Sequence, residues 1–363
     1  MKIVLLANRK WVHTVNWANT LDNLGHDIHV LSMHCGADQF NKSVKFHKLI
    51  IPAPVGYYLN VFQVKRLLRK INPDLLHAHY ASGYGTLNRL TNFSPNILSM
   101  WGSDVYEFPS KSKWHHHLIS KNLKHAEAVF STSNSMADHV KSFFNYSSKI
   151  WVTPFGVDLD TFHPGDIIAK QEITLGTVKK LESKYGIDLL LKAFKKLLES
   201  NDPVVKIKPI KLLIVGSGSK KGKLLRLSKR LKIEDSVQFI NHIPHSMVPH
   251  YLRQLDVYFA LSRSDSESFG VAILEASACQ VPVITSNKGG LPEVVRNEET
   301  GYIISEENID EIVEKSVMLI NNEKLRAELG KNGRSFVQNN YSEELTVEQM
   351  IRSYREVLSI NRK

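Results

Sequence analysis

Residues 262–275 read SRSDSESFGVAILE, and the organisation of the chain can be worked out from this stretch. It follows the apolar run 257–260 and opens a helical pattern, so Glu267 precedes a predicted helix and Glu275 lies about one to two turns inside it. The backbone amides expected at the helix start are those of Phe269, Gly270 and Val271. Such amides attract phosphate, whereas carboxylates accept hydrogen bonds from sugar and ribose hydroxyls. The stretch is a candidate site for a sugar nucleotide; the alternative is a capping role for Glu267 and a solvated Glu275.

Short apolar runs alternate with helical-period segments through both halves of the chain, a pattern typical of parallel sheets with crossover helices. We expect an α/β fold of two doubly wound, Rossmann-like domains, residues 1–164 and 165–341. Prolines and glycines in residues 154–165 mark the connection. Residues 342–363 contain one more amphipathic helix, expected to pack across the domain interface. The expected strands are 3–7, 28–32, 75–79, 97–100, 129–132 and 150–153, then 173–176, 212–215, 237–240, 257–260 and 283–285.

Three stretches together resemble the family 4 retaining glycosyltransferases, which are of the glycosyl transferase group 1 type. They are the two glutamates with Phe269-Gly270 between them, residues 156–158 (GVD) with Phe162 and Pro164, and residues 281–284 (VPVI) followed by 289–293 (GGLPE). The resemblance implies a GT-B fold, in which two Rossmann-like domains face each other across a cleft. It places a nucleotide-diphosphate sugar donor in the C-terminal domain and the acceptor mainly in the N-terminal domain. It also implies retention of configuration, with Glu267 on the donor sugar and Glu275 on the ribose.

A diphosphate leaving group needs positive charge, which Lys or Arg side chains supply without a metal. The family places an Arg and a Lys after the first strand of its C-terminal domain, where this chain has residues 177–186, TVKKLESKYG. The resemblance therefore assigns Lys180 and Lys184 to the diphosphate, with Lys179 as a spare cation. A solvated basic turn is the alternative.

Residues 216–222, GSGSKKG, follow another expected strand and superficially resemble a dinucleotide fingerprint. The third glycine comes one position too late for that motif, which disfavours a nicotinamide-dependent enzyme. The family has a glycine pair beside the nucleotide. Gly216 and Gly218 are therefore expected to let the backbone approach the donor.

The N-terminal domain has polar and aromatic residues directly after two expected strands, at 77–79 (HAH) and 101–104 (WGSD). Open sheets bind ligands at the carboxyl ends of their strands. Many relatives have a histidine near the reacting centre where Trp101 stands here. A core position for the histidines at 77 and 79 is the alternative. Asp104 is a candidate catalytic residue, and the acceptor-side candidates are His13, His79 and Trp101.

The net charge of +11 is concentrated in the N-terminal half, which indicates an anionic partner or, alternatively, solubility alone. A basic and aromatic nucleic-acid recognition motif is not evident, so we expect no nucleic-acid partner. Cys35 and Cys279 lie far apart in sequence, which fits a reducing compartment and hence the cytoplasm.

Two further patterns have a superficial metal-binding spacing. Asp158 and Asp160 form a D-x-D pair of the kind used by metal-dependent glycosyltransferases, and residues 115–117 are all histidine. Neither is joined by the further ligands that a bound ion needs. We therefore expect no metal and no cofactor.

Two basic, amphipathic segments, 60–72 and 111–125, indicate a peripheral contact with anionic membrane. The chain has no run of roughly 18 apolar residues, so a spanning helix is not expected. The membrane concerned would be the inner face of the plasma membrane. Packing of each apolar stripe on its own sheet is the alternative.

Family analogy predicts a UDP-linked donor and a glycan or lipid-linked acceptor, in bacterial cell-surface polysaccharide synthesis. A sugar-nucleotide epimerase or a phosphorylase shares the architecture and remains an alternative enzyme. A basic nucleic-acid-binding protein is the alternative from a different functional class.

Overall fold

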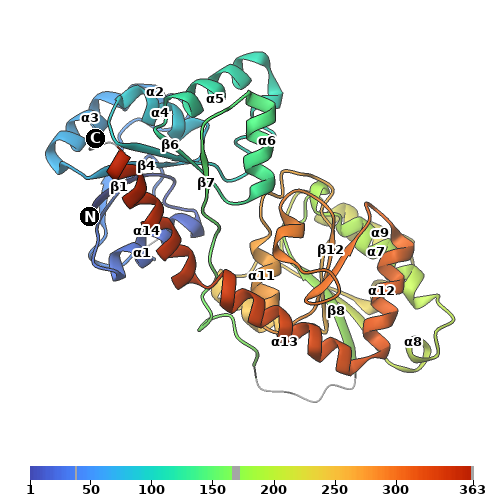
Figure 1. The fold of residues 1–363 in the computed structure, drawn as a ribbon. Coiled ribbons are helices and arrows are strands. Elements are labelled where there is room, and N and C mark those ends of the chain that lie inside the picture. The colour runs from blue at the N-terminus through green and yellow to red at the C-terminus, as the bar shows by residue number, and fades with distance from the viewer. Residues whose placement is uncertain (37–38, 166–171, 361–363) are drawn as a thin grey trace. The chain divides into compact units, whose positions relative to one another are not determined.

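The computed structural model describes residues 1–36, 39–165 and 172–360. The chain forms two compact units. Unit 1 comprises Met1–Phe155 together with the C-terminal segment from Thr346, and unit 2 comprises Gly156–Leu345. Each unit is built on one parallel sheet flanked by helices (Figure 1). The expected α/β class with two doubly wound domains is confirmed.

The sheet of unit 1 has seven parallel strands in the order β3-β2-β1-β4-β5-β6-β7. Their bounds are β1 Lys2–Leu6, β2 Asp27–Ser32, β3 Lys45–Lys48, β4 Leu75–His79, β5 Asn96–Ser99, β6 Ala128–Ser131 and β7 Ile150–Val152. The strand order reverses direction between β1 and β4, where Ile3 pairs with Leu75. Ligands of open α/β sheets bind beside such a reversal, at the carboxyl ends of the strands.

Helices cover both faces of this sheet. The helices are α1 Val12–Asn23, α2 Gly56–Leu59, α3 Val61–Ile71, α4 Gly83–Thr91, α5 Lys113–His125, α6 Asn134–Phe144 and α14 Glu343–Ile360. Alternate residues of a strand face opposite sides, so Val4 and Leu6 share one core with Val64 and Leu68 of α3. Figure 1 shows α14 and α1 on the other side of the sheet from α4 and α5.

The sheet of unit 2 has six parallel strands in the order β10-β9-β8-β11-β12-β13. The strands are β8 Ile173–Val178, β9 Ile210–Val215, β10 Val237–Ile240, β11 Val257–Ala260, β12 Val283–Ser286 and β13 Gly301–Ile304. The α-helices are α7 Ile187–Leu198, α8 Pro203–Ile207, α9 Lys221–Arg230, α10 Val248–Leu252, α11 Val271–Ala278, α12 Ile309–Asn321 and α13 Glu323–Asn340. Strands β3 and β13 are additional to those expected from the sequence.

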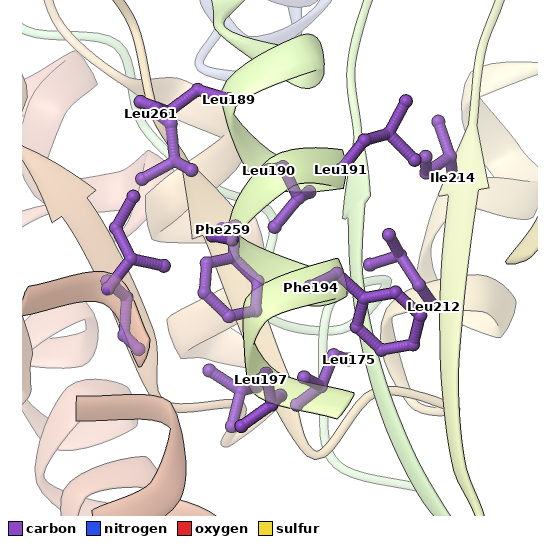
Figure 2. Close-up of a cluster of buried hydrophobic side chains, with 14 of the residues drawn as sticks. Leu175, Leu189, Leu190, Leu191, Phe194, Leu197, Leu212, Ile214, Phe259 and Leu261 are labelled. Carbon is purple, nitrogen blue, oxygen red and sulfur yellow. The ribbon is translucent and has the colours of Figure 1, made fainter. Parts of the chain in front are cut away.

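Helix α7 shows how unit 2 positions its loops. Leu190, Leu191, Phe194 and Leu197 recur at helical spacing and are buried against the strands, as Figure 2 shows. Their partners on the strands include Leu175, Leu212 and Phe259. Full burial of one such side chain stabilises the fold by roughly 1.5–3 kcal/mol. The packed helix holds the loop between β8 and α7, which carries the lysines named above.

The unit boundary lies between Phe155 and Gly156, before the expected boundary at 164/165. Two contacts explain why residues 156–165 belong to unit 2. Val157 pairs with Ser342 in a parallel bridge, and the Arg334 guanidinium donates a hydrogen bond of 3.0 Å to the Phe162 carbonyl. The C-terminal helix from Thr346 belongs to unit 1, where Tyr354 Oη lies 2.7 Å from His77 Nδ1.

Helices α3 and α5 lie within the segments expected to contact a membrane. The stripe of Val64, Leu68 and Ile71 on α3 is buried, so it packs within unit 1. On α5, Ile119 is buried whereas Trp114 is 57% exposed. Within the part of the chain that the structure describes, no helix is both long enough and apolar enough to cross a membrane.

Candidate active site

The loops that follow β8, β9, β11 and β12 meet at one edge of the unit 2 sheet, because these strands are parallel. They carry almost all the C-terminal site residues expected from the sequence. Glu267 lies in the loop after β11, and the lysines lie in the loop after β8. The backbone joins the two loops, since the Arg263 amide donates to the Lys184 carbonyl at 2.8 Å.

Lys179 and Glu267 form an ion pair at this edge. Lys179 Nζ donates to Glu267 Oε1 at 2.7 Å, and the two side chains are only 19% and 13% exposed. Lys179 Nζ also lies 4.9 Å from the centre of the Tyr185 ring. A partly buried carboxylate is costly unless it is paired, and Lys179 supplies that partner for Glu267. The spare lysine of the sequence analysis is therefore the one that contacts this glutamate.

The other two lysines differ in their surroundings. Lys184 Nζ donates to Ser266 Oγ at 3.3 Å, next to Glu267 in sequence, and lies 5.4 Å from the Tyr185 ring centre. Lys180 is exposed. The structure thus brings Lys179 and Lys184 to the glutamate-bearing loop and leaves Lys180 facing solvent.

A small pocket opens beside the ion pair. It is narrow, with a volume of about 10 Å³, and is lined at strands β8 and β11 by Thr177, Phe259 and Ala260. Lys179, Glu267 and Leu291 complete its wall.

Glu275 is buried inside α11 and has a partner that the sequence analysis did not identify. His245 Nε2 lies 2.8 Å from Glu275 Oε1. This hydrogen bond raises the pKa of His245 and outweighs the opposite effect of burial. His245 follows β10 and begins a short 3₁₀ helix, His245–Met247, so it meets Glu275 only in the folded unit. The Phe162 ring lies 5.5 Å from the imidazole.

Helix α11 begins as the sequence predicts. Gly270 is its N-cap with φ +101°, a conformation that L side chains rarely adopt, and Val271 is its first residue. Phe269 is buried just before the cap. A Cβ atom on Gly270 would lie 2.9 Å from Leu291 Cδ2. The cap therefore has both a backbone and a packing reason to be glycine.

Gly216 and Gly218 pack against the loop after β8. Gly216 has φ +145°, and a Cβ there would lie 2.0 Å from the Lys179 carbonyl oxygen. A Cβ on Gly218 would lie 2.4 Å from the Leu181 carbonyl oxygen. The glycines therefore permit close contact between two protein loops, a physical reason different from the expected approach to a donor.

In unit 1, Asp104 is fully buried and binds backbone amides. Its carboxylate accepts hydrogen bonds from Ala81 N at 2.6 Å, Gly102 N at 2.9 Å and Trp101 N at 3.1 Å. Burial raises the pKa of Asp104 to about 6, although these hydrogen bonds oppose the shift. Asp104 thus ties together the loops that follow β4 and β5, which is a structural task.

His13, His79 and Trp101 are brought together after β1, β4 and β5. The His13 ring stacks on Phe155 at 3.9 Å and lies 5.9 Å from the Trp101 ring, while His79 lies 4.8 Å from Trp101. Burial lowers the pKa of His79 to about 3, so its imidazole is neutral at physiological pH. His77 is a core residue, bonded through its two ring nitrogens to Tyr354 and Ser99.

The two patterns with a superficial metal-binding spacing lie on a turn and on a helix. In 1–36, 39–165 and 172–360, no three His, Cys, Asp or Glu side chains are placed to hold an ion. Asp158 Oδ1 instead accepts hydrogen bonds from the amides of Asp160 and Thr161, which organises the turn. The three histidines at 115–117 lie on helix α5.

Two family models match the chain. The one described as "Glycosyl transferases group 1" matches residues 160–336, and the one described as "Glycosyl transferase 4-like" matches residues 2–133. N-acetyl-alpha-D-glucosaminyl L-malate synthase of Bacillus anthracis is 25% identical over 360 residues, covering 92% of this chain and 90% of that protein. D-inositol 3-phosphate glycosyltransferase of Segniliparus rotundus is 31% identical over 230 residues, covering 61% of this chain and 50% of that protein.

Solved structures with the same fold include two that span nearly the whole chain. Sucrose-phosphate synthase from Thermosynechococcus elongatus has a TM-score of 0.82 at 19% identity, covering 99% of this chain and 100% of that one. Anabaena Alr3699/HepE in complex with UDP has a TM-score of 0.82 at 15% identity, covering 98% and 100%. With the two parallel sheets, these similarities confirm the expected GT-B fold class.

Proposed function

Because the chain belongs to the group 1 glycosyltransferases of the family 4 type, we propose that it transfers a sugar from a UDP-linked donor to a hydroxyl of a glycan or lipid-linked acceptor. The observation that carries this proposal is a pair of carboxylates that are each positioned by a basic side chain. Glu267 pairs with Lys179, and Glu275 pairs with His245. Glu267 precedes α11 and Glu275 lies about one turn inside it, so the two carboxylates for sugar hydroxyls flank the helix start, whose amides can bind phosphate. The similar Anabaena protein was solved with UDP, which supports a nucleoside-diphosphate donor.

Each charged group has a proposed role in donor binding. Glu267 accepts hydrogen bonds from the donor sugar, and Glu275 accepts them from the ribose. Lys180 and Lys184 bind the diphosphate, and the exposure of Lys180 leaves its ammonium accessible to a ligand. Lys179 acts differently, since it holds Glu267 and so positions the carboxylate for the sugar.

We further propose that the reaction retains the configuration of the sugar and needs no metal. The bond between the sugar C1 and the diphosphate oxygen breaks, and a bond between C1 and the acceptor oxygen forms on the same face. The acceptor proton moves to a diphosphate oxygen, so no protein nucleophile takes part. Lysine side chains stabilise the charge that develops on the leaving group. EDTA should leave the rate unchanged, whereas a loss of activity restored by Mg²⁺ or Mn²⁺ would contradict this part.

A thermal-shift screen tests donor binding. UDP, GDP and their hexose derivatives are added to the wild-type protein, and a ligand that binds the folded state raises Tm. Glu275→Gln should lower the affinity for the stabilising nucleotide by about tenfold, which is the scale of one lost hydrogen bond to a charged group. Glu328→Gln, an exposed change on α13, is the control. Absence of stabilisation by every nucleotide and sugar nucleotide would overturn the proposal.

Unit 1 has exposed apolar side chains beside exposed cations. Four apolar side chains around α2 are exposed, with Ile50 at 78% and Phe62 at 79%, followed by Val55 and Leu59. We call these four residues the apolar patch. The neighbouring helix α3 adds exposed Arg66, Arg69 and Lys70. Apolar side chains beside cations bind anionic membrane, so we propose reversible docking of unit 1 at the cytoplasmic face of the plasma membrane, during cell-surface polysaccharide synthesis.

A further inference from the structure

Three aromatic side chains gather at the carboxyl ends of β1, β4 and β5 in unit 1. The Trp11 ring centre lies 4.9 Å from that of Tyr80 and 5.3 Å from that of Trp101. All three side chains are partly exposed. We call them the aromatic platform. Phe155, in the segment after β7, lies 5.5 Å from Trp101 and packs against it.

The platform is held in place by buried groups. Asp104 accepts hydrogen bonds from Ala81 N and Trp101 N, so one carboxylate fixes the residue after Tyr80 and Trp101 itself. The Tyr80 hydroxyl is hydrogen bonded to Ser103 Oγ. This arrangement explains a task for Asp104 that its sequence position did not reveal: it orders two aromatic residues of the platform.

Tyr80 has an unusual backbone conformation. Its φ is +85°, in the left-handed region that bulky side chains rarely adopt. Such a conformation persists only where the surroundings impose it, and is concentrated at ligand-binding and active sites. The strained backbone indicates that the orientation of the Tyr80 side chain, at the carboxyl end of β4, is important for function.

The chemistry of the platform suits a sugar ring. A pyranose presents C–H groups on its faces and hydroxyls at its rim, so a face can pack on the electron-rich face of an aromatic ring while the hydroxyls stay hydrated. An anionic alcohol such as malate or an inositol phosphate needs cations instead. Two cations precede Trp11. Arg9 lies with its guanidinium 3.9 Å from the Phe46 ring centre, toward β3. Burial lowers the pKa of His34, and Lys10 is close enough to that imidazole to lower its pKa further.

We propose that Trp11, Tyr80 and Trp101 bind a pyranose ring of the acceptor by stacking, so that the acceptor is a sugar-bearing molecule and not a small anionic alcohol. This inference rests on the proposed function and specifies the acceptor class. It gives Trp101 a binding role in place of the histidine that many relatives have there. Trp11, the N-cap residue of α1, contributes another of the three rings.

The test compares two acceptor classes on one protein saturated with UDP. Methyl β-D-galactopyranoside and methyl α-D-mannopyranoside represent pyranosides, whereas L-malate and myo-inositol 1-phosphate represent anionic alcohols. Binding is followed by tryptophan emission and by calorimetry. At least one pyranoside should bind and perturb the emission, and the anionic compounds should not compete with it. Binding of only the anionic compounds, or of none of the four, would overturn the proposal.

Variants identify the residue responsible. Trp11→Ala should lower the affinity for the pyranoside roughly tenfold, which is the scale of losing one stacked aromatic contact. Trp11→Phe should restore most of the affinity. Trp114→Ala, an exposed tryptophan on α5, is the matched control and should have no effect. Unchanged pyranoside affinity in Trp11→Ala would place the sugar elsewhere. UDP stabilisation, measured on each variant, reports the donor site separately, so a failed platform is distinguished from a failed donor assignment.

Discussion

Lys179 Nζ lies 2.7 Å from Glu267 Oε1, and both side chains are largely buried at the edge of the unit 2 sheet. The lysine next to it in sequence, Lys180, is exposed instead. The two lysines therefore have different relations to the glutamate. Lys179 holds it, and Lys180 is proposed to contact the diphosphate.

A double-mutant cycle on turnover separates these roles. Glu267→Gln and Lys179→Ala should each lower kcat, and together they should cost much less than the sum, because either change breaks the same pair. The coupling energy should exceed about 1 kcal/mol, as for groups in one charged network. The control cycle pairs Glu267→Gln with Lys180→Ala, which should be additive. Strong coupling to Lys180 and none to Lys179 would reverse the two assignments.

The glycines after β9 make a prediction about stability. Gly218→Ala should lower the free energy of unfolding by about 1–3 kcal/mol, the usual cost of overpacking, because its Cβ would lie 2.4 Å from the Leu181 carbonyl oxygen. Gly222→Ala is the matched control, since its Cβ would have only Arg226 Nη1 nearby, at 3.8 Å. Urea unfolding of both variants measures the difference. Equal free energies of unfolding for the two variants would show that the loop carrying Leu181 adjusts to the added methyl group without loss of stability.

The His245–Glu275 pair predicts a pH dependence. The hydrogen bond to Glu275 raises the pKa of His245 above its ordinary value of 6.5. A raised histidine pKa stabilises the folded state fully below about pH 6.5, and this contribution is lost as the pH rises through the raised pKa. The Tm difference between wild type and His245→Gln should therefore be larger at pH 6 than at pH 9.

The exposure of His245 determines how large this Tm difference should be, and a second histidine variant serves as the control. The imidazole is 44% exposed, so solvent screens the pair and the shift should be a few degrees at most, as for about 1 kcal/mol. His250→Gln, an exposed change on α10, controls for loss of an imidazole. A difference that grows with rising pH would mean that the pair is not an ion pair in solution.

The apolar patch predicts binding to anionic vesicles. Co-sedimentation with vesicles of phosphatidylglycerol and phosphatidylcholine should fall as salt is added, because each exposed cation near the surface contributes about 1 kcal/mol. Phe62→Glu should abolish binding. Ile207→Glu, at an equally exposed isoleucine in unit 2, is the control and should leave it unchanged. Equal binding by both variants, or none by the wild type at low salt, would exclude docking through the patch.

Most of the fold was predictable from hydrophobic periodicity, and the exceptions have physical reasons. Strand β3 reads KFHK and lies at the sheet edge with most of its side chains exposed, so it lacks an apolar run. Strand β13, Gly301–Ile304, is short and begins with glycine. The exposed position of Phe62, beside buried stripe residues of α3, depends on how that helix packs.

The candidate site was predictable only where its residues are close in sequence. Glu267, Gly270 and Glu275 belong to one strand-loop-helix segment, so their spacing places them together. His245 reaches Glu275 from the loop after β10, and Lys179 reaches Glu267 from the loop after β8, contacts that only tertiary structure provides. The sequence likewise shows that Asp104 follows a strand. It does not predict the three backbone amides that donate hydrogen bonds to the Asp104 carboxylate.

The measurement that tests the central claim most directly is product analysis with the stabilising sugar nucleotide and a pyranoside acceptor. Nucleoside diphosphate release is followed with and without the acceptor, and NMR determines the anomeric configuration of the product. We predict release that depends on the acceptor and a glycoside with the same configuration as the donor. An inverted product, or an epimerised sugar nucleotide formed without acceptor, would contradict the assignment as a retaining glycosyltransferase.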